Sequence, residues 1–457
     1  MPFDFERRRV SVLVQRDSER MLVVKGSPED VLRLCAHYEE NDGAAVSSLD
    51  AAARARIAER YDQFSRDGFR VLGIACRDVP LNHDHAGLAD ESALVFVGFA
   101  AFLDPPKASA AQALTALAAS GVMVKVVTGD NELVTRHVCA ELRLPVGDVL
   151  NGTDLQQMDD EALQVQAERV NLFCRVTPAQ KTRILAALRA RGHVVGFLGD
   201  GINDAPSLHA ADVGISVEGA VDVAKEAADL ILLDQDLGVL HEGVREGRRT
   251  FGNVMKYIMM GTSSNFGNMF SMAGGTLLLS FLPMLPIQIL LNNFLYDVSE
   301  IAIPFDDVEE ATLARPQVWD MTFVRRFMLA LGPVSSVFDF LTFFVLLYGF
   351  HAGEELFHTG WFVESIATQV LVIFVIRTRG SPFTDRPHRW LVVLALAVVA
   401  IAATLPFTPL GRTLGFVPPP RVFYGVLTGI VCAYLVAVQM AKRAFYRLTA
   451  EAATKTG

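Results

Sequence analysis

The sequence has 457 residues, of which 51% are hydrophobic, and its formal net charge is −10. This acidic balance argues against a nucleic-acid-binding surface, which needs a basic patch or stripe. Residues 1–250 carry most of the charge, whereas apolar runs of bilayer-spanning length recur from residue 251 onward. The composition therefore predicts two to four domains, with a soluble first half and a membrane-embedded second half.

The cysteines and the first residues indicate the compartment. The five cysteines show neither Cys-x-x-Cys nor metal-ligand spacing, which predicts reduced thiols in a cytosol-facing protein. They are Cys35, Cys76, Cys139, Cys174 and Cys432. The first nine residues are polar and basic, so no secretory signal peptide is expected, and the start resembles the interior of a folded sheet.

Residues 1–100 predict a mixed α+β region. Two β-rich runs, over 10–14 and 20–24, surround a polar turn, which is typical of an antiparallel hairpin. Pro28 suits the first turn of a helix directly after this hairpin. A second helix is predicted over 48–66, and two further strands over 70–76 and 94–102.

From Asp104 onward, strands and helices alternate, a pattern typical of a doubly wound parallel sheet. Strands are predicted over 122–127, 193–198 and 212–216, and helices over 108–120, 132–142, 178–191 and 205–210. Ligands in such sheets bind at the carboxyl ends of the strands. Thr128-Gly129-Asp130 and Gly199-Asp200-Gly201 each follow an apolar strand, so we expect a catalytic site at these two loops.

The apolar half predicts six membrane spans, at about 254–280, 284–304, 323–350, 361–377, 390–407 and 421–441. Basic residues gather on one side of these spans: Arg315, Arg325, Arg326, Arg377, Arg379, Arg386, Arg389, Lys442, Arg443 and Arg447. The opposite loops, at 281–284 and 351–360, contain neither Lys nor Arg, and the third, at 408–420, has only Arg412. The positive-inside rule therefore predicts that the soluble half and the C-terminus are cytoplasmic.

The stretch from Gly199 to Pro206 is the strongest chemical signal. Asp200 and Asp204 can hold Mg²⁺ against a phosphoryl group, and Asn203 adds a neutral ligand or donor. Upstream, Thr128 and the amide of Gly129 can bind phosphate oxygens. Lys181, near the start of a helix, can offset the developing negative charge. A tight turn is the alternative for Gly-Asp-Gly alone, but it does not account for the combined motifs.

Polar side chains inside two predicted spans suggest a cation site. Asn293 and Asp297 are four residues apart on one helix face, and Asn265 and Asn268 are three apart on another. Amides with few carboxylates suit Mg²⁺, which keeps part of its water shell. Hydrogen bonding between helices is the alternative role for the asparagines. An ionisable residue within a span is a functional hypothesis by default, and Glu300 and Asp339 are weaker candidates of this kind.

These motifs resemble those of the P-type ATPases, namely Asp104-Pro105-Pro106, Thr128-Gly129-Asp130 and the string from Gly199 to Pro206. The resemblance implies part of a nucleotide-binding domain over 1–100 and a haloacid-dehalogenase-like phosphorylation domain over 101–250. It also implies a six-helix transmembrane domain over 251–445 and a cytoplasmic tail over 446–457. The resemblance further implies that Asp130 acts with Thr128 to secure the transferred phosphate, and that the enzyme uses ATP and Mg²⁺.

The resemblance also implies an ATP-binding set. Lys25-Gly26-Ser27-Pro28-Glu29 is similar to a nucleotide-domain motif whose lysine lies beside ATP, which implies this position for Lys25 and Gly26. Phe3 is similar to the phenylalanine that stacks on adenine, although Phe5 competes for this role, and Arg70 to the phosphate-contacting arginine. Arg175 forms with Lys181 a pair similar to the basic pair between the phosphorylation motifs.

Within the family, the chain most resembles the bacterial magnesium-importing branch, which implies transported Mg²⁺ and a location in the bacterial plasma membrane. The strings that carry this similarity lie at Asn265–Ser271, Asn292–Asp297, Pro304–Asp306 and Gly332–Asp339. Asn265, Asn268, Asn293 and Asp297 are the implied ligands of the transported ion. A pump for Ca²⁺ or a monovalent cation is the alternative within the same fold.

Three family features do not occur in the sequence: the Asp-Lys-Thr-Gly-Thr nucleophile motif, the actuator Thr-Gly-Glu, and the first four membrane helices. We therefore expect that the chain alone forms no aspartyl-phosphate and moves no ions. Three origins fit the sequence: a truncated sequence, a split or degenerate gene, or a half that assembles with an N-terminal half of the same pump. A membrane-anchored haloacid-dehalogenase-like phosphatase is disfavoured because it requires an Asp nucleophile on the first strand. A non-catalytic ATP-binding remnant is a further alternative.

Overall fold

The computed structural model describes residues 1–2, 7–16, 19–40, 45–81, 85–234, 236–382 and 385–456. Phe3 and Phe5, the two candidates for adenine stacking, lie outside the described residues. The chain divides into two compact units, Met1–Glu242 and Gly243–Gly457, here called unit 1 and unit 2. Each unit has its own hydrophobic core, and each is described by itself.

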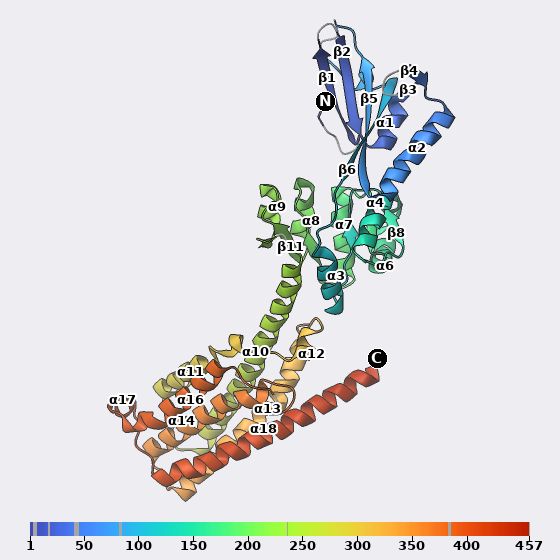
Figure 1. The fold of residues 1–457 in the computed structure, drawn as a ribbon. Helices are drawn as coiled ribbons and strands as arrows, with labels where there is room; N and C mark the ends of the chain where they lie inside the picture. Colours follow the sequence, from blue (N-terminus) through green and yellow to red (C-terminus); the bar gives the residue numbers. More distant parts are fainter. Residues whose placement is uncertain are drawn as a thin grey trace. The chain divides into compact units, whose positions relative to one another are not determined.

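Unit 1 begins with a six-stranded sheet of order β1-β2-β5-β6-β3-β4. Its strands are β1 (Arg9–Arg16), β2 (Glu19–Gly26), β3 (Cys35–Glu40), β4 (Ala45–Ser48), β5 (Phe69–Asp78) and β6 (Leu94–Leu103). β1 and β2 form the predicted hairpin, and only β3 and β6 pair in parallel. Helices α1 (Pro28–Leu34) and α2 (Ala51–Arg66) pack on the sheet (Figure 1). A short 3₁₀ turn, η1 (Leu88–Asp90), precedes β6.

Two three-stranded parallel sheets follow instead of the single doubly wound sheet expected from the sequence. The first has the order β7-β9-β8, from β7 (Val126–Val127), β8 (Val149–Asn151) and β9 (Leu172–Cys174). The second has the order β10-β11-β12, from β10 (Gly196–Leu198), β11 (Val213–Val217) and β12 (Leu230–Leu232). In the described part of the chain, β7 and β10 each pair with one strand, so one edge of each is open. The predicted strand 122–127 is correspondingly short, because only its last two residues find a partner.

Helices connect these strands, as the alternating pattern predicts. They are α3 (Ala110–Ala119), α4 (Glu132–Glu141), α5 (Gly152–Gln157), α6 (Asp160–Arg169), α7 (Pro178–Ala190), α8 (Ala205–Ala210) and α9 (Asp222–Ala227), with the 3₁₀ turn η2 (Ile202–Asp204) before α8. α7 shows how the sequence sets an element: Thr177 and Gln180 cap each other's backbone amides, and Pro178 occupies the first turn. Ile184, Leu185 and Leu188 of α7 then point into the core.

Unit 2 is helical. Its long helices are α10 (Gly238–Leu278), which begins in unit 1, α11 (Pro286–Glu300), α13 (Met321–Phe344), α14 (Glu354–Leu371), α16 (Arg389–Thr404) and α18 (Arg421–Thr456). Shorter turns lie between them: η3 (Ile303–Phe305), α12 (Glu310–Leu313), η4 (Val345–Gly349), α15 (Ile373–Ile376), η5 (Leu405–Phe407) and α17 (Pro409–Thr413). The six long helices occupy the positions of the six predicted spans.

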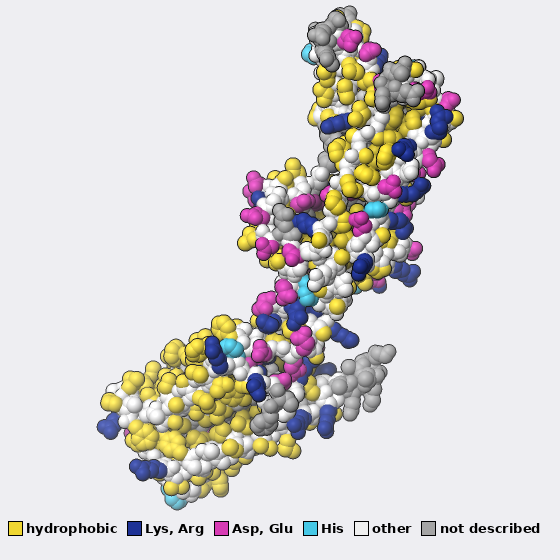
Figure 2. Space-filling model, viewed as in Figure 1, with side chains coloured by type: hydrophobic (Ala, Val, Ile, Leu, Met, Phe, Trp, Pro, Cys, Tyr) yellow, Lys and Arg dark blue, Asp and Glu magenta, His cyan; other side chains and the backbone are white. Residues whose placement is uncertain are grey.

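Four helical segments of the described chain are long and apolar enough to cross a membrane, judged by length and composition. They are Met321–Gly349, Glu354–Ile376, Arg389–Phe407 and Arg421–Thr449. α11 has only 15 residues, and α10 carries many polar side chains, so neither of these predicted spans meets the same criterion. On the face shown in Figure 2, hydrophobic side chains cover most of unit 2, whereas charged side chains are scattered over unit 1.

α14 is the central helix of unit 2. Its most hydrophobic stretch is 89% buried, against 33–44% for the other three spans. Its own aromatic side chains Phe357, Trp361 and Phe362 are fully buried, and the helix packs against α13, α16 and α18. α14 therefore has little surface left for lipid.

A buried charge network lies where α10, the segment after η3 and the segment after α15 meet. The Asp306 carboxylate accepts hydrogen bonds from Lys256 Nζ at 2.7 Å and from Arg377 Nε at 2.9 Å. Burial opposes the charge on Asp306, but the bonds from Arg377 and Lys256 outweigh it and hold its pKa below the ordinary value. Nearby, Lys442 of α18 donates to the carbonyls of Val375, Thr378 and Gly380 at 2.7–3.0 Å.

The cysteines are free, as predicted. Burial raises the pKa of the Cys35 thiol to about 12 and that of Cys174 to about 11. Both thiols are therefore protonated and unreactive at neutral pH.

Candidate functional site

The Thr128 loop follows β7 and is held by backbone hydrogen bonds. The amide of Asp130 donates to Thr128 Oγ1 at 3.1 Å, and the amide of Val176 donates to the Thr128 carbonyl at 3.1 Å. The amide of Arg175, which has a left-handed φ of 52°, donates to the Asp130 carbonyl at 2.9 Å. These bonds place the ends of β7 and β9 together and fix the loop that carries the predicted phosphate ligands.

The second loop, from Gly199 to Pro206, follows β10 and leads into η2 and α8. Asp204 is only 9% exposed, and its carboxylate accepts from Lys181 Nζ at 2.7 Å and from the Gly201 amide at 3.2 Å. A Cβ on Gly199 would lie 2.6 Å from that of Asp204, so only glycine fits there. Asp200, by contrast, is exposed. The two predicted Mg²⁺ ligands thus share one loop but differ in burial.

A cavity of about 500 Å³ in unit 1 brings many of the predicted residues together. It is lined by Arg70, Gly129, Asp130, Arg175, Lys181 and Asn203 from the predicted set. Thr128, Asp200 and Asp204 belong to the same loops but do not line the cavity. Unpredicted residues also line it, among them Glu29, Tyr61 and Asn131. Of these, only Glu29 belongs to a motif that the sequence analysis singled out.

Basic and acidic side chains from distant parts of unit 1 meet at this cavity. Arg70 of β5 contacts Asp104 Oδ2 at 2.8 Å and Asp130 Oδ2 at 3.0 Å. Arg175 contacts Glu29 Oε1 at 2.5 Å. Two arginines that could bind phosphate are therefore paired with carboxylates, and an anionic ligand would compete for them.

The remaining predicted ATP residues lie elsewhere. Lys25 is exposed on β2, and neither it nor Gly26 lines the cavity. A Cβ on Gly26 would lie 2.4 Å from the Arg8 carbonyl, so close packing of the strands suffices to explain this glycine.

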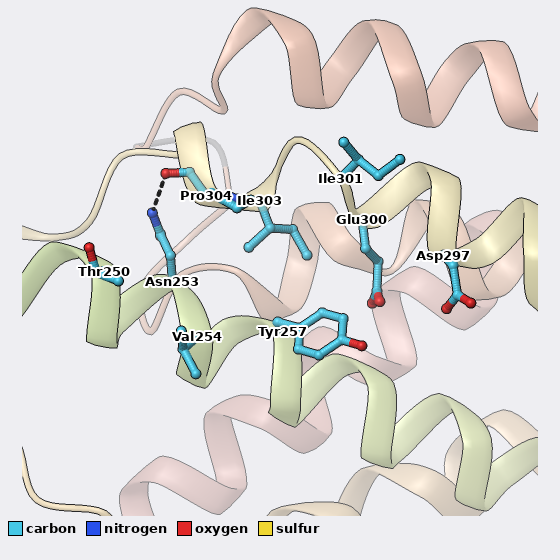
Figure 3. A pocket seen from close by; sticks show the side chains of 9 residues that line it. All are labelled: Thr250, Asn253, Val254, Tyr257, Asp297, Glu300, Ile301, Ile303 and Pro304. Carbon is cyan, nitrogen blue, oxygen red and sulfur yellow. Dashed lines mark hydrogen bonds between the residues drawn. The ribbon is translucent and has the colours of Figure 1, made fainter.

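In unit 2, the four predicted ion ligands differ in their exposure and surroundings. Asn265, Asn293 and Asp297 are exposed, and Asn268 is half-buried, its Oδ1 accepting from Ser365 Oγ at 3.4 Å. Asp297 lines a cavity of about 380 Å³ that Asn253, Tyr257 and Glu300 also line (Figure 3). Asn292 and Glu300, also on α11, are buried.

A second acidic pair lies deeper in unit 2. Asp339 of α13, a weaker candidate from the sequence, is 1% exposed and accepts from Ser271 Oγ at 2.6 Å and from Trp361 Nε1 at 3.0 Å. Glu364 of α14 is its electrostatic neighbour, is fully buried, and has no hydrogen-bond partner for either carboxylate oxygen in the described structure. Glu364 was not among the residues predicted from the sequence, although a carboxylate inside an apolar span is a recognisable signal.

The donor chemistry fits Mg²⁺ in both units. Among the described residues, no group of three or more His, Cys, Asp or Glu side chains is arranged around a common point. The sites instead offer one or two carboxylates with amide oxygens, and Mg²⁺ accepts such partial sets because it retains several waters.

Comparison with known proteins gives two matching family models. Residues 1–109 match the model for the cytoplasmic domain N of P-type ATPases, and residues 281–444 match that for the C-terminus of cation-transporting ATPases. These matches cover both ends of the chain, one in each unit.

Relatives match nearly the whole chain. Magnesium-transporting P-type ATPases of Salmonella typhimurium (strain LT2) and Escherichia coli (strain K12) are each 46% identical over 453 residues, or 98% of this chain. A calcium-transporting ATPase of Bacillus subtilis (strain 168) is 27% identical over 433 residues, or 91% of the chain. The chain spans about half the length of these relatives, 50% of the first two and 48% of the third. On these matches and on the loops described above, the chain belongs to the P-type ATPase family.

Proposed function

We propose that this chain is the part of a magnesium-transporting P-type ATPase that contains nucleotide-contacting residues, the phosphoryl-transfer loops and the later membrane helices. The observation that carries the proposal is the cavity of unit 1, because it gathers Arg70, Asp130, Arg175, Lys181 and Asn203 from separate elements. Positioned charges of this kind supply most of the rate in phosphoryl transfer.

Each residue has a distinct role in the proposed reaction. Arg70 and Arg175 bind phosphate oxygens of ATP, exchanging the carboxylates of Asp130 and Glu29 for the incoming anion. Thr128 and the Gly129 amide hold the transferred phosphoryl group, and Lys181 offsets its charge. Asp200 and Asp204, with Asn203, would hold Mg²⁺, which supplies Lewis-acid stabilisation of the phosphoryl oxygens. ATP and Mg²⁺ are therefore the proposed cofactors.

The phosphorylated carboxylate has to come from elsewhere in the pump, since Asp-Lys-Thr-Gly-Thr does not occur in these 457 residues. The open edges of β7 and β10 support such a completion. Both strands end in phosphate-binding loops, so a further parallel strand paired to either edge would end at the same place. We propose that this strand carries the aspartate nucleophile and completes a haloacid-dehalogenase-like sheet.

Mg²⁺ is the proposed transported ion because the residues of α10 and α11 offer amides and few carboxylates. Asn265, Asn268, Asn293 and Asp297 are the proposed ligands. Ca²⁺ sites use six to eight oxygens with several carboxylates, which is a poorer fit. The proposed location is the plasma membrane of a bacterium, with unit 1 and the C-terminus in the cytoplasm, as the distribution of Lys and Arg favours.

A chimera tests the proposal. The half of the Escherichia coli relative that this chain does not cover is joined to residue 1, and the chimera is expressed in cells that lack their own magnesium importers. We expect growth at low external Mg²⁺ and an acid-stable phosphoenzyme from radiolabelled ATP. Phosphoenzyme without growth rescue would refute Mg²⁺ as cargo, whereas rescue without phosphoenzyme would refute the proposed chemistry.

A further inference from the structure

The cavity between α10 and α11 contains acidic groups that the proposed ion ligands do not account for. We propose that it binds a hydrated divalent cation and that Glu300 is its second carboxylate, beside Asp297. This site rests on the proposed function and adds to it a second binding site on the transport path. There the ion is held before it loses, or after it regains, its water shell. The site adds Glu300 and Asn253 to the residues that recognise the ion.

The walls of the cavity come from two helices and the turn that follows α11. In Figure 3 the carboxyl groups of Asp297 and Glu300 lie on the same side of α11 and face α10, from which Asn253 and Tyr257 extend. Thr250 and Val254 of α10 complete one wall, and Ile301, Ile303 and Pro304 complete the other. Carboxylate, amide and hydroxyl groups thus border one space, as the hydration shell of a hard cation requires.

Two buried oxygens at this cavity have no partner in the described structure. Glu300 is 5% exposed, and its Oε1 accepts no hydrogen bond. Asn253 is 3% exposed, and its Nδ2 donates to the Pro304 and Asp306 carbonyls at 3.0 Å each. These two bonds orient the amide and leave Oδ1 without a partner. Buried oxygens without donors are unfavourable, and the water shell of a bound cation would satisfy both.

The charges around the cavity also favour the binding of a cation. No Lys, Arg or His is among its lining residues, all of which the structure describes. The neighbouring cations, Lys256 and Arg377, are bound to Asp306. The carboxyl groups of Asp297 and Glu300 therefore have no cationic partner among the residues that line the cavity.

The size of the cavity favours an ion that keeps its waters. Its volume is about 380 Å³. A Mg²⁺ ion with a full octahedral shell needs about 180 Å³, taking roughly 30 Å³ for each water. A hydrated ion fits, and the carboxylates then bind through its waters.

Binding to the detergent-solubilised full chain tests this site without turnover. The probes are Mn²⁺ and hexaamminecobalt(III), whose ammine ligands do not exchange, so that it binds only as an intact shell. Asp200→Asn and Asp204→Asn are introduced throughout to remove the other proposed metal site. We expect Glu300→Gln to weaken both probes by about 10- to 100-fold, as loss of an outer ligand typically does.

The matched control is Glu355→Gln, which removes an exposed carboxylate at the start of α14 and should leave both affinities unchanged. If Glu300→Gln lowers the unfolding temperature, the Asp297→Asn variant takes its place. Asp297 is exposed, and the asparagine side chain has the same shape as the aspartate that it replaces. Equal binding by the parent and both variants would overturn the site. Binding of Mn²⁺ but not of hexaamminecobalt(III) would overturn the hydrated state. If the full chain and its variants bind both probes as expected but the chimera does not rescue growth, the proposed function is refuted and the cation site is not.

Discussion

Carboxylates in the two units differ in their partners, although the residue types are the same. At the proposed phosphoryl-transfer loops of unit 1, Asp204 is bonded to Lys181 at 2.7 Å and Asp130 to Arg70 at 3.0 Å. At the cavity of unit 2, Asp297 and Glu300 face only amide, hydroxyl and apolar groups among the lining residues. The first arrangement is balanced before any ligand arrives, whereas the second is balanced only by a bound cation.

The difference matches the charge of the proposed ligands. ATP brings negative charge to unit 1, so its site needs cations that can exchange a carboxylate for a phosphate. A transported cation brings positive charge to unit 2, and a protein ammonium there would occupy its place. Asp306 extends the comparison within unit 2, because it is buried like Glu300 but has two cationic partners.

The largest expected effect separates partnered from unpartnered carboxylates. Asp306→Asn leaves Lys256 and Arg377 buried without their counter-ion, and we expect a loss of about 3–5 kcal/mol in unfolding free energy. Asp297→Asn is the matched control, since it removes a carboxylate that has no cationic partner and should not lower stability without Mg²⁺. Thermal unfolding of the full chain in detergent measures both. Equal losses would contradict the division into two kinds of carboxylate.

The next effect concerns chemistry in unit 1. In the chimera, Asp204→Asn should lower phosphoenzyme formation by about 100- to 1,000-fold, comparable to removing one stabilising group from a transition state. Asp160→Asn, an exposed carboxylate bonded to Arg183, serves as the control and should leave the rate unchanged. Rapid-quench labelling measures the two rates. A normal rate with Asp204→Asn would remove it from the proposed metal site.

A smaller effect is expected at the buried acidic pair. Ser271→Ala removes one of the two hydrogen bonds to Asp339 and should lower the unfolding free energy by about 1–3 kcal/mol. Thr276→Ala, on an exposed position of the same helix, should change it little. Unfolding temperatures of the two variants decide the matter. Similar values would mean that the Ser271 hydroxyl contributes nothing to Asp339.

Nucleotide affinity distinguishes Arg70 from Lys25. Arg70 lines the cavity of unit 1, so Arg70→Ala should weaken ATP binding by about tenfold, the loss of one charge-assisted hydrogen bond. Lys25→Ala should have a smaller effect if the exposed position of Lys25 on β2 also holds with ATP bound. Isothermal titration of the full chain with ATP measures both affinities. A larger effect for Lys25 would favour the family-derived role over the observed cavity.

The smallest effect is a pH dependence of unit 2. Because the folded pKa of Asp306 lies below its ordinary value of 3.8, its contribution to stability is fully present above that value and is lost as pH falls through the folded pKa. Unfolding temperature should therefore fall below about pH 4. Asp306→Asn should remove this part of the dependence. An unchanged profile would assign the acid sensitivity to other carboxylates.

Local rules account for the parts of the structure that the sequence predicted. Pro28 and Pro178 mark helix starts, and alternating β-rich runs mark the β1–β2 hairpin, since these signals act within a few residues. The parallel pairing of β3 with β6 was not predicted, because it joins Cys35 to Leu94 across a long sequence separation. The separation into two three-stranded sheets also depends on pairing that no local pattern encodes.

The candidate sites were likewise predictable from the sequence only where local motifs mark them. The motifs identified both loops of unit 1, but the cavity also depends on Glu29 and Tyr61, which come from the six-stranded sheet region. In unit 2, helical spacing predicts Asn293 and Asp297 on one face of α11, and both are exposed. It could not tell whether that face or the one with Asn292 packs inward, because both carry polar groups. Burial of Glu300 and Glu364 therefore emerged only from the packed helices.

Lys442 has a practical consequence for anyone who engineers this protein. Its ammonium group joins α18 to the carbonyls of Val375, Thr378 and Gly380, which lie in and just after α15. Truncations that remove this lysine would leave those carbonyls without this donor and would remove a tie between α18 and the segment after α15. Purification tags appended at the C-terminus would leave these hydrogen bonds in place.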